Sequence, residues 1–134
     1  MFVDACAVIA MLSSEPEAER IATALSSAKQ RLTSPIAVFE AVMGLGRPDK
    51  FNLPIDVVER IVLEFLEEHS IEIRDLPPAG ITTTLALSAA HRYRSGRRGL
   101  NLGDCLHYAC AKHYDVPILA TGGEFRHTDL ETVL

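Results

Sequence analysis

The chain has 134 residues, of which 48% are hydrophobic and 23% are charged, and its formal net charge is -5. This length is typical of one domain, and the apolar fraction is sufficient for a full core. The negative charge excludes nucleic-acid binding through the overall field of the protein, so any such contact requires a local basic patch.

The cysteines and the N-terminus indicate the compartment. Cys6, Cys105 and Cys110 show neither zinc-type spacing nor the even number of a disulfide framework. Cys105 and Cys110 have apolar neighbours, and we expect both to be buried. No segment approaches the about 20 apolar residues of a membrane span, and no basic region precedes the N-terminal apolar run. We therefore expect a cytoplasmic protein that does not contact a membrane.

Apolar periodicity and capping signals predict an alternation of strands and helices. In chain order we expect a strand over 1–3, a helix over 5–12, a helix to 28, a strand at 32–33, a helix to 45, a helix over 54–68, a strand over 70–73, a helix over 81–94, a helix over 103–114, a strand over 116–120, a loop over 121–130 and a strand over 131–134. Ser14 and Glu17 form a capping box that starts the second helix, and Ser34-Pro35 starts the third. Apolar strands between helices predict a covered sheet.

Two aspartates lie where such a fold binds ligands. Asp4 follows the first predicted strand directly, and ligands of open parallel sheets bind outside the carboxyl ends of the strands. Asp104 lies in the first turn of the last helix, after Asn101 and Gly103, where free N–H groups and the helix dipole favour an ionised carboxylate. Each has a structural alternative, because Asp4 could cap the following helix and Asp104 could stabilise only its own.

Glu40 is the only charged residue of the third helix. Helical spacing places it on one face with Ile36, Ala37 and Met43, along an apolar surface. An unpaired ionised acid there would be costly, so Glu40 needs a cation, a salt-bridge partner or a raised pKa. A buried salt bridge and a metal ligand are the two interpretations.

A basic cluster precedes the Asp104 segment, with Tyr93 within it. Its members are Arg92, Arg94, Arg97 and Arg98. Four arginines within seven residues of an acidic chain suggest a phosphate-binding patch, which predicts contact with RNA if the site acts on a phosphodiester. The alternative is a favourable charge at a helix C-terminus.

Asp4, Glu40 and Asp104 can converge at one edge if the strands are parallel. Clustered carboxylates repel one another unless a divalent cation lies between them. Oxygen ligands without a cysteine and histidine cluster point to Mg²⁺ or Mn²⁺ rather than zinc. Such an ion activates water and stabilises charge on a phosphodiester under attack.

Four segments carry a resemblance to a known family: FVDACAV at the N-terminus, Ser34-Pro35 followed five residues later by Glu40, LNLGDC at Asp104, and VPILATGGEFRHTDL. Together they resemble the PIN-domain ribonucleases, in particular the VapC-type toxins, over nearly the whole chain. The resemblance implies a single PIN domain over 1–134, with a Rossmann-like three-layer α/β/α fold and a central, mainly parallel sheet. It also implies RNA cleavage with Mg²⁺ or Mn²⁺, a homodimer, and a VapB-like antitoxin protein as partner.

By this likeness Asp4, Glu40 and Asp104 match the first three acids of the family, as metal ligands and water activators, with Asp4 and Asp104 holding the ion. Two departures follow. Ala5-Cys6 stand where the family often has Thr-Ser or Ser-Ser, which removes one hydroxyl that forms hydrogen bonds. Gly122-Gly123-Glu124-Phe125 stands where a Gly-Asp-Asp-Phe-like run carries the fourth acid, so that Glu124 substitutes or Asp129 leans in.

The sequence thus predicts an endoribonuclease toxin with Asp4, Glu40, Asp104 and Glu124 as catalytic residues. The main alternative is a PIN fold with weakened catalysis that only binds RNA or a partner protein, and Gly123 motivates it. A phosphatase of the haloacid dehalogenase type is disfavoured, because its second Asp would stand where Cys6 is. A structural protein is disfavoured because it would have no use for three acids in such positions.

Overall fold

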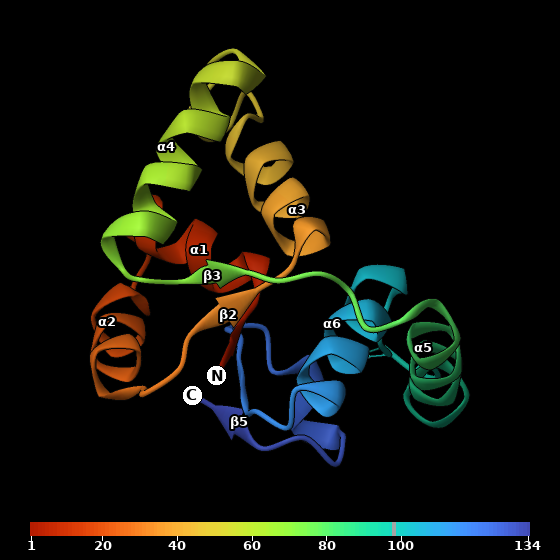
Figure 1. The fold of residues 1–134 in the computed structure, drawn as a ribbon. Helices are drawn as coiled ribbons and strands as arrows, with labels where there is room; N and C mark the ends of the chain where they lie inside the picture. Colours follow the sequence, from red (N-terminus) through yellow and green to blue (C-terminus); the bar gives the residue numbers. More distant parts are fainter. Residues whose placement is uncertain (98) are drawn as a thin grey trace.

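The computed structural model describes residues 1–97 and 99–134, and these contain six α-helices, one 3₁₀ helix and five strands (Figure 1). The elements are β1 (Phe2–Val3), α1 (Ala5–Leu12), α2 (Ala18–Ser27), β2 (Leu32–Thr33), α3 (Pro35–Leu45), α4 (Ile55–Glu68), β3 (Glu72–Ile73), α5 (Ala79–Tyr93), α6 (Leu102–His113), β4 (Ile118–Leu119), η1 (Glu124–His127) and β5 (Thr132–Val133). The expected order of strands and helices is confirmed.

The strands form one sheet in the order β3-β2-β1-β4-β5, and every pairing in the described part is parallel. Phe2 of the central strand is in register with Leu32 of β2 and with Ile118 of β4. Because all the strands run the same way, their carboxyl ends meet at one edge. Asp4, which follows β1, therefore lies at the middle of that edge.

Successive side chains of β1 point to opposite faces of the sheet, and helices cover both faces. Val3 packs with Leu119 into a core that also contains the buried residues of α1, α2 and α4. Phe2 packs with Ile118 into a second core against α5 and α6. The predicted three-layer α/β/α fold is confirmed. Figure 1 shows α3 beside α4 above the sheet and α5 beside α6 at the right.

The expected capping box of Ser14 and Glu17 is wrong. Ser14 has a φ of 52° and ends α1 instead, because its N–H donates to Met11 O while the N–H of Glu15 donates to Ala10 O. This pair of bonds is a Schellman motif, with Ser14 as its left-handed residue. A residue used in this way cannot also cap α2, which begins at Ala18 without a side-chain cap.

Other boundaries differ from the expected ones by a few residues. The strands expected over 70–73, 116–120 and 131–134 are each paired over two residues only. α5 begins at Ala79 rather than 81, because Pro78 takes an extended conformation and its carbonyl accepts the N–H of Thr82 as the first helical bond. The segment 121–130, expected as a loop, contains η1.

No helix within residues 1–97 and 99–134 is long and apolar enough to cross a membrane. Cys105 and Cys110 are buried, as expected from their apolar neighbours, and both are free thiols.

Candidate metal centre

Asp4 leaves β1 and starts α1. Its backbone N–H donates to Leu119 O at 3.0 Å, and its Oδ2 accepts the N–H of Cys6 at 3.2 Å as the helix cap. The residue is 4% exposed, and Oδ1 makes no hydrogen bond with any described residue. Asp4 is therefore a cap and also presents, at the ligand edge of the sheet, a buried carboxylate oxygen that makes no hydrogen bond with the described residues.

The Cys6 thiol takes the place of the hydroxyl that the sequence seemed to lack. Its Sγ donates to Asp4 Oδ2 at 2.6 Å and accepts the N–H of Thr121 at 3.2 Å. Burial raises the pKa of this thiol, and the neighbouring Asp4 carboxylate raises it further. The neutral thiol thus connects Asp4 to the loop after β4 and forms hydrogen bonds at a position where the chain has no hydroxyl.

Glu40 reaches the same edge from α3. As predicted, Ser34 caps this helix by accepting the N–H of Ala37, and Pro35 is its first residue. Its Oε2 lies 2.8 Å from Nε2 of His107, and its side chain is 39% exposed. The carboxylate packs on Gly103 of α6, where any Cβ would overlap it. Glu40 therefore has a hydrogen-bond partner in His107, although the sequence did not reveal which residue it would be.

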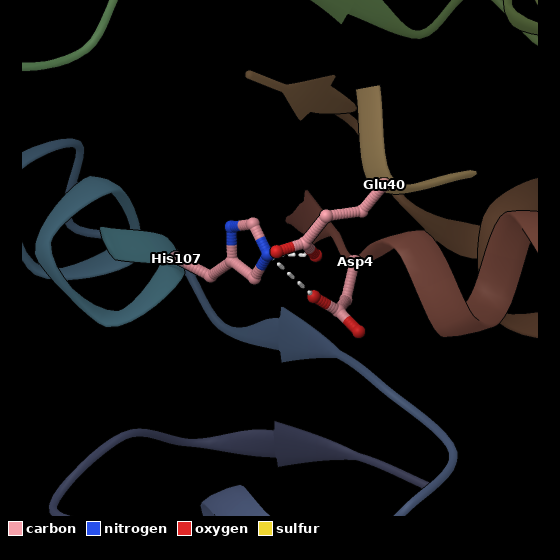
Figure 2. Close-up of side chains that lie close together, drawn as sticks. All are labelled: Asp4, Glu40 and His107. Carbon is pink, nitrogen blue, oxygen red and sulfur yellow. Dashed lines mark hydrogen bonds and ion pairs between the residues drawn. The ribbon is translucent and has the colours of Figure 1, made fainter. Parts of the chain in front are cut away.

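His107 is the residue of this cluster that the sequence analysis missed. It lies inside α6, is 1% exposed, and its Nε2 is 3.4 Å from Asp4 Oδ1 (Figure 2). Burial by itself would lower the pKa of His107, but the hydrogen bond with Glu40 and the negative charges of Asp4 and Glu40 outweigh it, and the pKa is raised. A single histidine on an apolar helix face gives no signal in the sequence that it will meet two acids.

Asp104 serves both its helix and the cluster. Asn101 is the N-cap of α6; its side chain accepts the N–H of Asp104 at 2.8 Å, and its own N–H donates to Asp104 Oδ2 at 2.9 Å. Burial raises the pKa of Asp104 to about 6, and the carboxylates of Asp4 and Glu124 add to the shift. Asp104 therefore stabilises its own helix, which was the structural alternative, but its carboxylate also interacts electrostatically with two other acids of the candidate site.

Glu124 and Asp129 have different surroundings. Glu124 begins η1 after Gly123, which has a φ of 78°, and its carboxylate folds over Gly122, where a Cβ would overlap it. Asp129 instead accepts hydrogen bonds from Tyr108 at 2.7 Å and from Lys112 at 2.9 Å. These contacts occupy both oxygens of Asp129, so Glu124 is the better placed of the two for a fourth acid.

Two arginines of the basic cluster lie beside Glu124. Arg92 and Arg97 line a groove of about 520 Å³ together with Tyr93, Glu124 and His127. Arg92 also stacks on the Tyr93 ring and lies 3.9 Å from Asp129. Arg94 is exposed at the end of α5, and Arg98 lies outside the described residues. The groove would place cations next to an acid of the site.

The cluster is consistent with a metal site. One ligating atom from each of Asp4, Glu40 and His107 lies within 4.8 Å of the others. Atoms bound to one octahedral ion at about 2.1 Å lie roughly 3 to 4.2 Å apart, and the 4.8 Å limit of this cluster is only slightly wider. The buried Oδ1 of Asp4 also fits, because its ion-pair contact with His107 Nε2 is 3.4 Å long and it makes no hydrogen bond, which leaves this ionised oxygen open to a cation.

The comparisons with known proteins agree with this fold. A family model described as the PIN domain matches residues 1–130, so the chain is a PIN domain. The chain is also 32% identical over 139 residues to ribonuclease VapC30 of Mycobacterium tuberculosis, which covers 99% of this chain and 98% of that protein. Within the PIN domains, the chain therefore belongs to the VapC ribonuclease toxins of toxin–antitoxin systems.

Two solved structures show the same fold. The crystal structure of Mycobacterium tuberculosis VapC20, described as a sarcin-ricin loop cleaving toxin, has a TM-score of 0.73 at 14% identity and covers 96% of this chain and 95% of its own. A toxin–antitoxin complex from Klebsiella pneumoniae has a TM-score of 0.69 at 15% identity, with coverage of 96% and 92%.

Proposed function

We propose that the chain is a Mg²⁺- or Mn²⁺-dependent endoribonuclease that acts as the toxin of a toxin–antitoxin pair. The observation that carries this proposal is the meeting of Asp4 and Glu40 at the carboxyl edge of the sheet, where the buried Oδ1 of Asp4 makes no hydrogen bond with the described residues. The family supports it, since ribonuclease VapC30 aligns over the whole chain.

In this proposal Asp4 and Asp104 hold the ion together with Glu40, and Glu124 completes the acidic site. A divalent cation bound there would lower the pKa of a water molecule and stabilise negative charge on the phosphodiester. Arg92 and Arg97, which line the groove beside Glu124, would bind neighbouring RNA phosphates. We also propose that Arg94, which is exposed directly after α5, contributes to binding RNA.

The partners are part of the same proposal. A similar fold occurs in a toxin–antitoxin complex, which supports a VapB-like antitoxin as a partner of this chain. We also propose a homodimer, and a cytoplasmic location in which the three free thiols stay reduced.

The test is cleavage of a panel of structured RNAs with Mg²⁺ or Mn²⁺ by the wild type and by Asp104→Asn. The asparagine keeps an oxygen for the N–H of Asn101 but removes the charge, so we expect a folded protein without cleavage. Asp56→Asn is the matched control, because Asp56 is a first-turn acid of α4 outside the site. Equal cleavage by wild type and Asp104→Asn would contradict the proposal.

A catalytically weakened module is the second candidate. The observation that favours it is Gly123, which has a φ of 78° where the family run has an acid. Such a conformation is costly for residues other than glycine, so an aspartate could not replace Gly123 without backbone strain in this loop. Binding of Mn²⁺ without turnover of any RNA in the panel would favour this module over the nuclease.

A further inference from the structure

The ring of His107 lies between the two acids that form the proposed metal centre. Figure 2 shows its Nε2 directed at both, with Glu40 Oε2 at 2.8 Å and Asp4 Oδ1 at 3.4 Å. The ring packs against Phe2 of the central strand, with centroids 5.6 Å apart. This packing and the burial of His107 fix the ring in place relative to the end of β1.

The position of the ring proton follows from these neighbours. Nε2 faces carboxylate oxygens, which accept hydrogen bonds, whereas Nδ1 is buried and has no hydrogen-bond partner within residues 1–97 and 99–134. A proton on Nδ1 would be buried without an acceptor, and the Nε2 lone pair would face two anions. The proton therefore belongs on Nε2.

This protonation argues against His107 as a metal ligand. A ligating histidine binds the ion through a nitrogen without a proton and usually donates its other N–H to an acceptor. His107 would have to move its proton to Nδ1, where the described residues offer no acceptor. Toward the acids His107 is a hydrogen-bond donor.

We propose that His107 is a positioning residue, whose Nε2–H holds the Glu40 carboxylate beside Asp4 so that their remaining oxygens can bind one hard cation. Asp4 is already fixed by the N–H and the thiol of Cys6, and it needs little help. Glu40 has a long side chain that is 39% exposed, and ordering it costs conformational entropy. It is also repelled by Asp4, so a donor between the two stabilises their approach.

This inference rests on the proposed metal site and predicts how Mg²⁺ and Mn²⁺ affinities change when His107 is replaced. Loss of a residue that orients a ligand usually lowers metal affinity about 10–100-fold. Because His107 acts through Glu40, its loss should weaken Mg²⁺ and Mn²⁺ by a similar factor. A nitrogen ligand would instead favour Mn²⁺ over Mg²⁺, so its removal would change the ratio of the two affinities.

The experiment measures Mg²⁺ and Mn²⁺ dissociation constants of the full chain and three variants, each first checked for folding by circular dichroism. His107→Leu removes the donor, whereas His107→Gln keeps an N–H at a similar distance from the backbone. His113→Leu is the control, because His113 is an exposed residue of the same helix. We expect the Leu variant at 107 to lose about 10–100-fold for both ions, and the Gln variant to regain most of it.

Two further measurements identify the cause. In a Glu40→Gln background, His107→Leu should have little additional effect on Mn²⁺ affinity, since the positioned carboxylate is gone. Pulsed EPR of Mn²⁺ bound to the wild type should show no coupling to a coordinated nitrogen, and this measurement does not depend on the folding of any variant.

A coordinated nitrogen that disappears in His107→Gln would overturn the positioning role, as would unchanged affinities in a folded His107→Leu protein. In both cases the metal site itself would stand. A folded wild type that binds neither ion would instead overturn the proposed metal site, and the positioning role with it.

Discussion

Replacing Gly103 by alanine should separate metal binding from stability. Gly103 is the second residue of α6, and a Cβ there would overlap the Glu40 carboxylate and lie 3.3 Å from Asn101 Oδ1. The carboxylate is the free end of a flexible side chain that is 39% exposed, so we expect it to move rather than the backbone. Its movement would break the 2.8 Å hydrogen bond with His107.

Two changes in the free energy of unfolding oppose each other in this variant. Alanine in place of glycine in a helix adds up to about 1 kcal/mol. A hydrogen bond to a charged group contributes about 1.5–3 kcal/mol, and the displaced carboxylate regains water, so the lower end applies here. The net loss of stability is therefore within about 1 kcal/mol. Metal affinity has no compensating gain and should fall about 10–100-fold.

Urea unfolding without metal and titration with Mn²⁺ measure the two quantities. Gly80→Ala is a matched control, because Gly80 is the second residue of α5 and an added Cβ has no other atom within 4 Å. This control should gain up to about 1 kcal/mol and keep its Mn²⁺ affinity. Wild-type Mn²⁺ affinity in Gly103→Ala would refute the reasoning, since metal binding would then not depend on the position of the Glu40 carboxylate against Gly103.

Three other changes test neighbouring contacts. Cys6→Ala should lower stability by about 1–2 kcal/mol because it leaves the Thr121 N–H without an acceptor, whereas Cys6→Ser should stay close to wild type in urea unfolding; equal losses would contradict the role of the thiol. Hydrogen bonds from Lys112 and Tyr108 hold the pKa of Asp129 at about 2, below its usual 3.8, so the contribution of Asp129 to the free energy of unfolding is complete above pH 4 and is lost as the pH falls through 2. Because the site is exposed, we expect wild type and Asp129→Asn to differ in stability by about 1 kcal/mol or less, and this difference should shrink as the pH falls over that range. Arg97→Ala should weaken RNA binding and reduce its salt dependence without changing Mn²⁺ affinity. A change in Mn²⁺ affinity with unchanged RNA binding would contradict the proposal that Arg97 binds RNA phosphates.

The order of elements could be predicted from the sequence because its signals are local. The apolar runs at Phe2 and Ile118, the Ser34-Pro35 helix start and the amphipathic α4 each need only a few neighbouring residues. The capping box at Ser14 could not be told from a helix ending, because serine serves in both and the choice depends on where α1 stops.

The candidate site was predictable in part. Asp4 and Asp104 follow from their places at a strand end and a helix start, which are again local features. The pairing of Glu40 with His107 joins residues 67 positions apart, and nothing in the sequence links them before the fold is known. For Asp129 a signal existed, since Tyr108 and Lys112 are four residues apart on one helix face and together form a place for a carboxylate.

The central position of β1 has a consequence for the timing of synthesis. Phe2 pairs with Ile118, and Asp4 donates its backbone N–H to Leu119, so one side of the first strand is completed only by residues that are synthesised much later than the strand itself. At about 5–20 residues per second, the ribosome needs on the order of ten seconds to supply them. A nascent chain that has not yet reached Leu119 therefore lacks the pairing that holds Asp4 in place, and its acidic centre is not assembled.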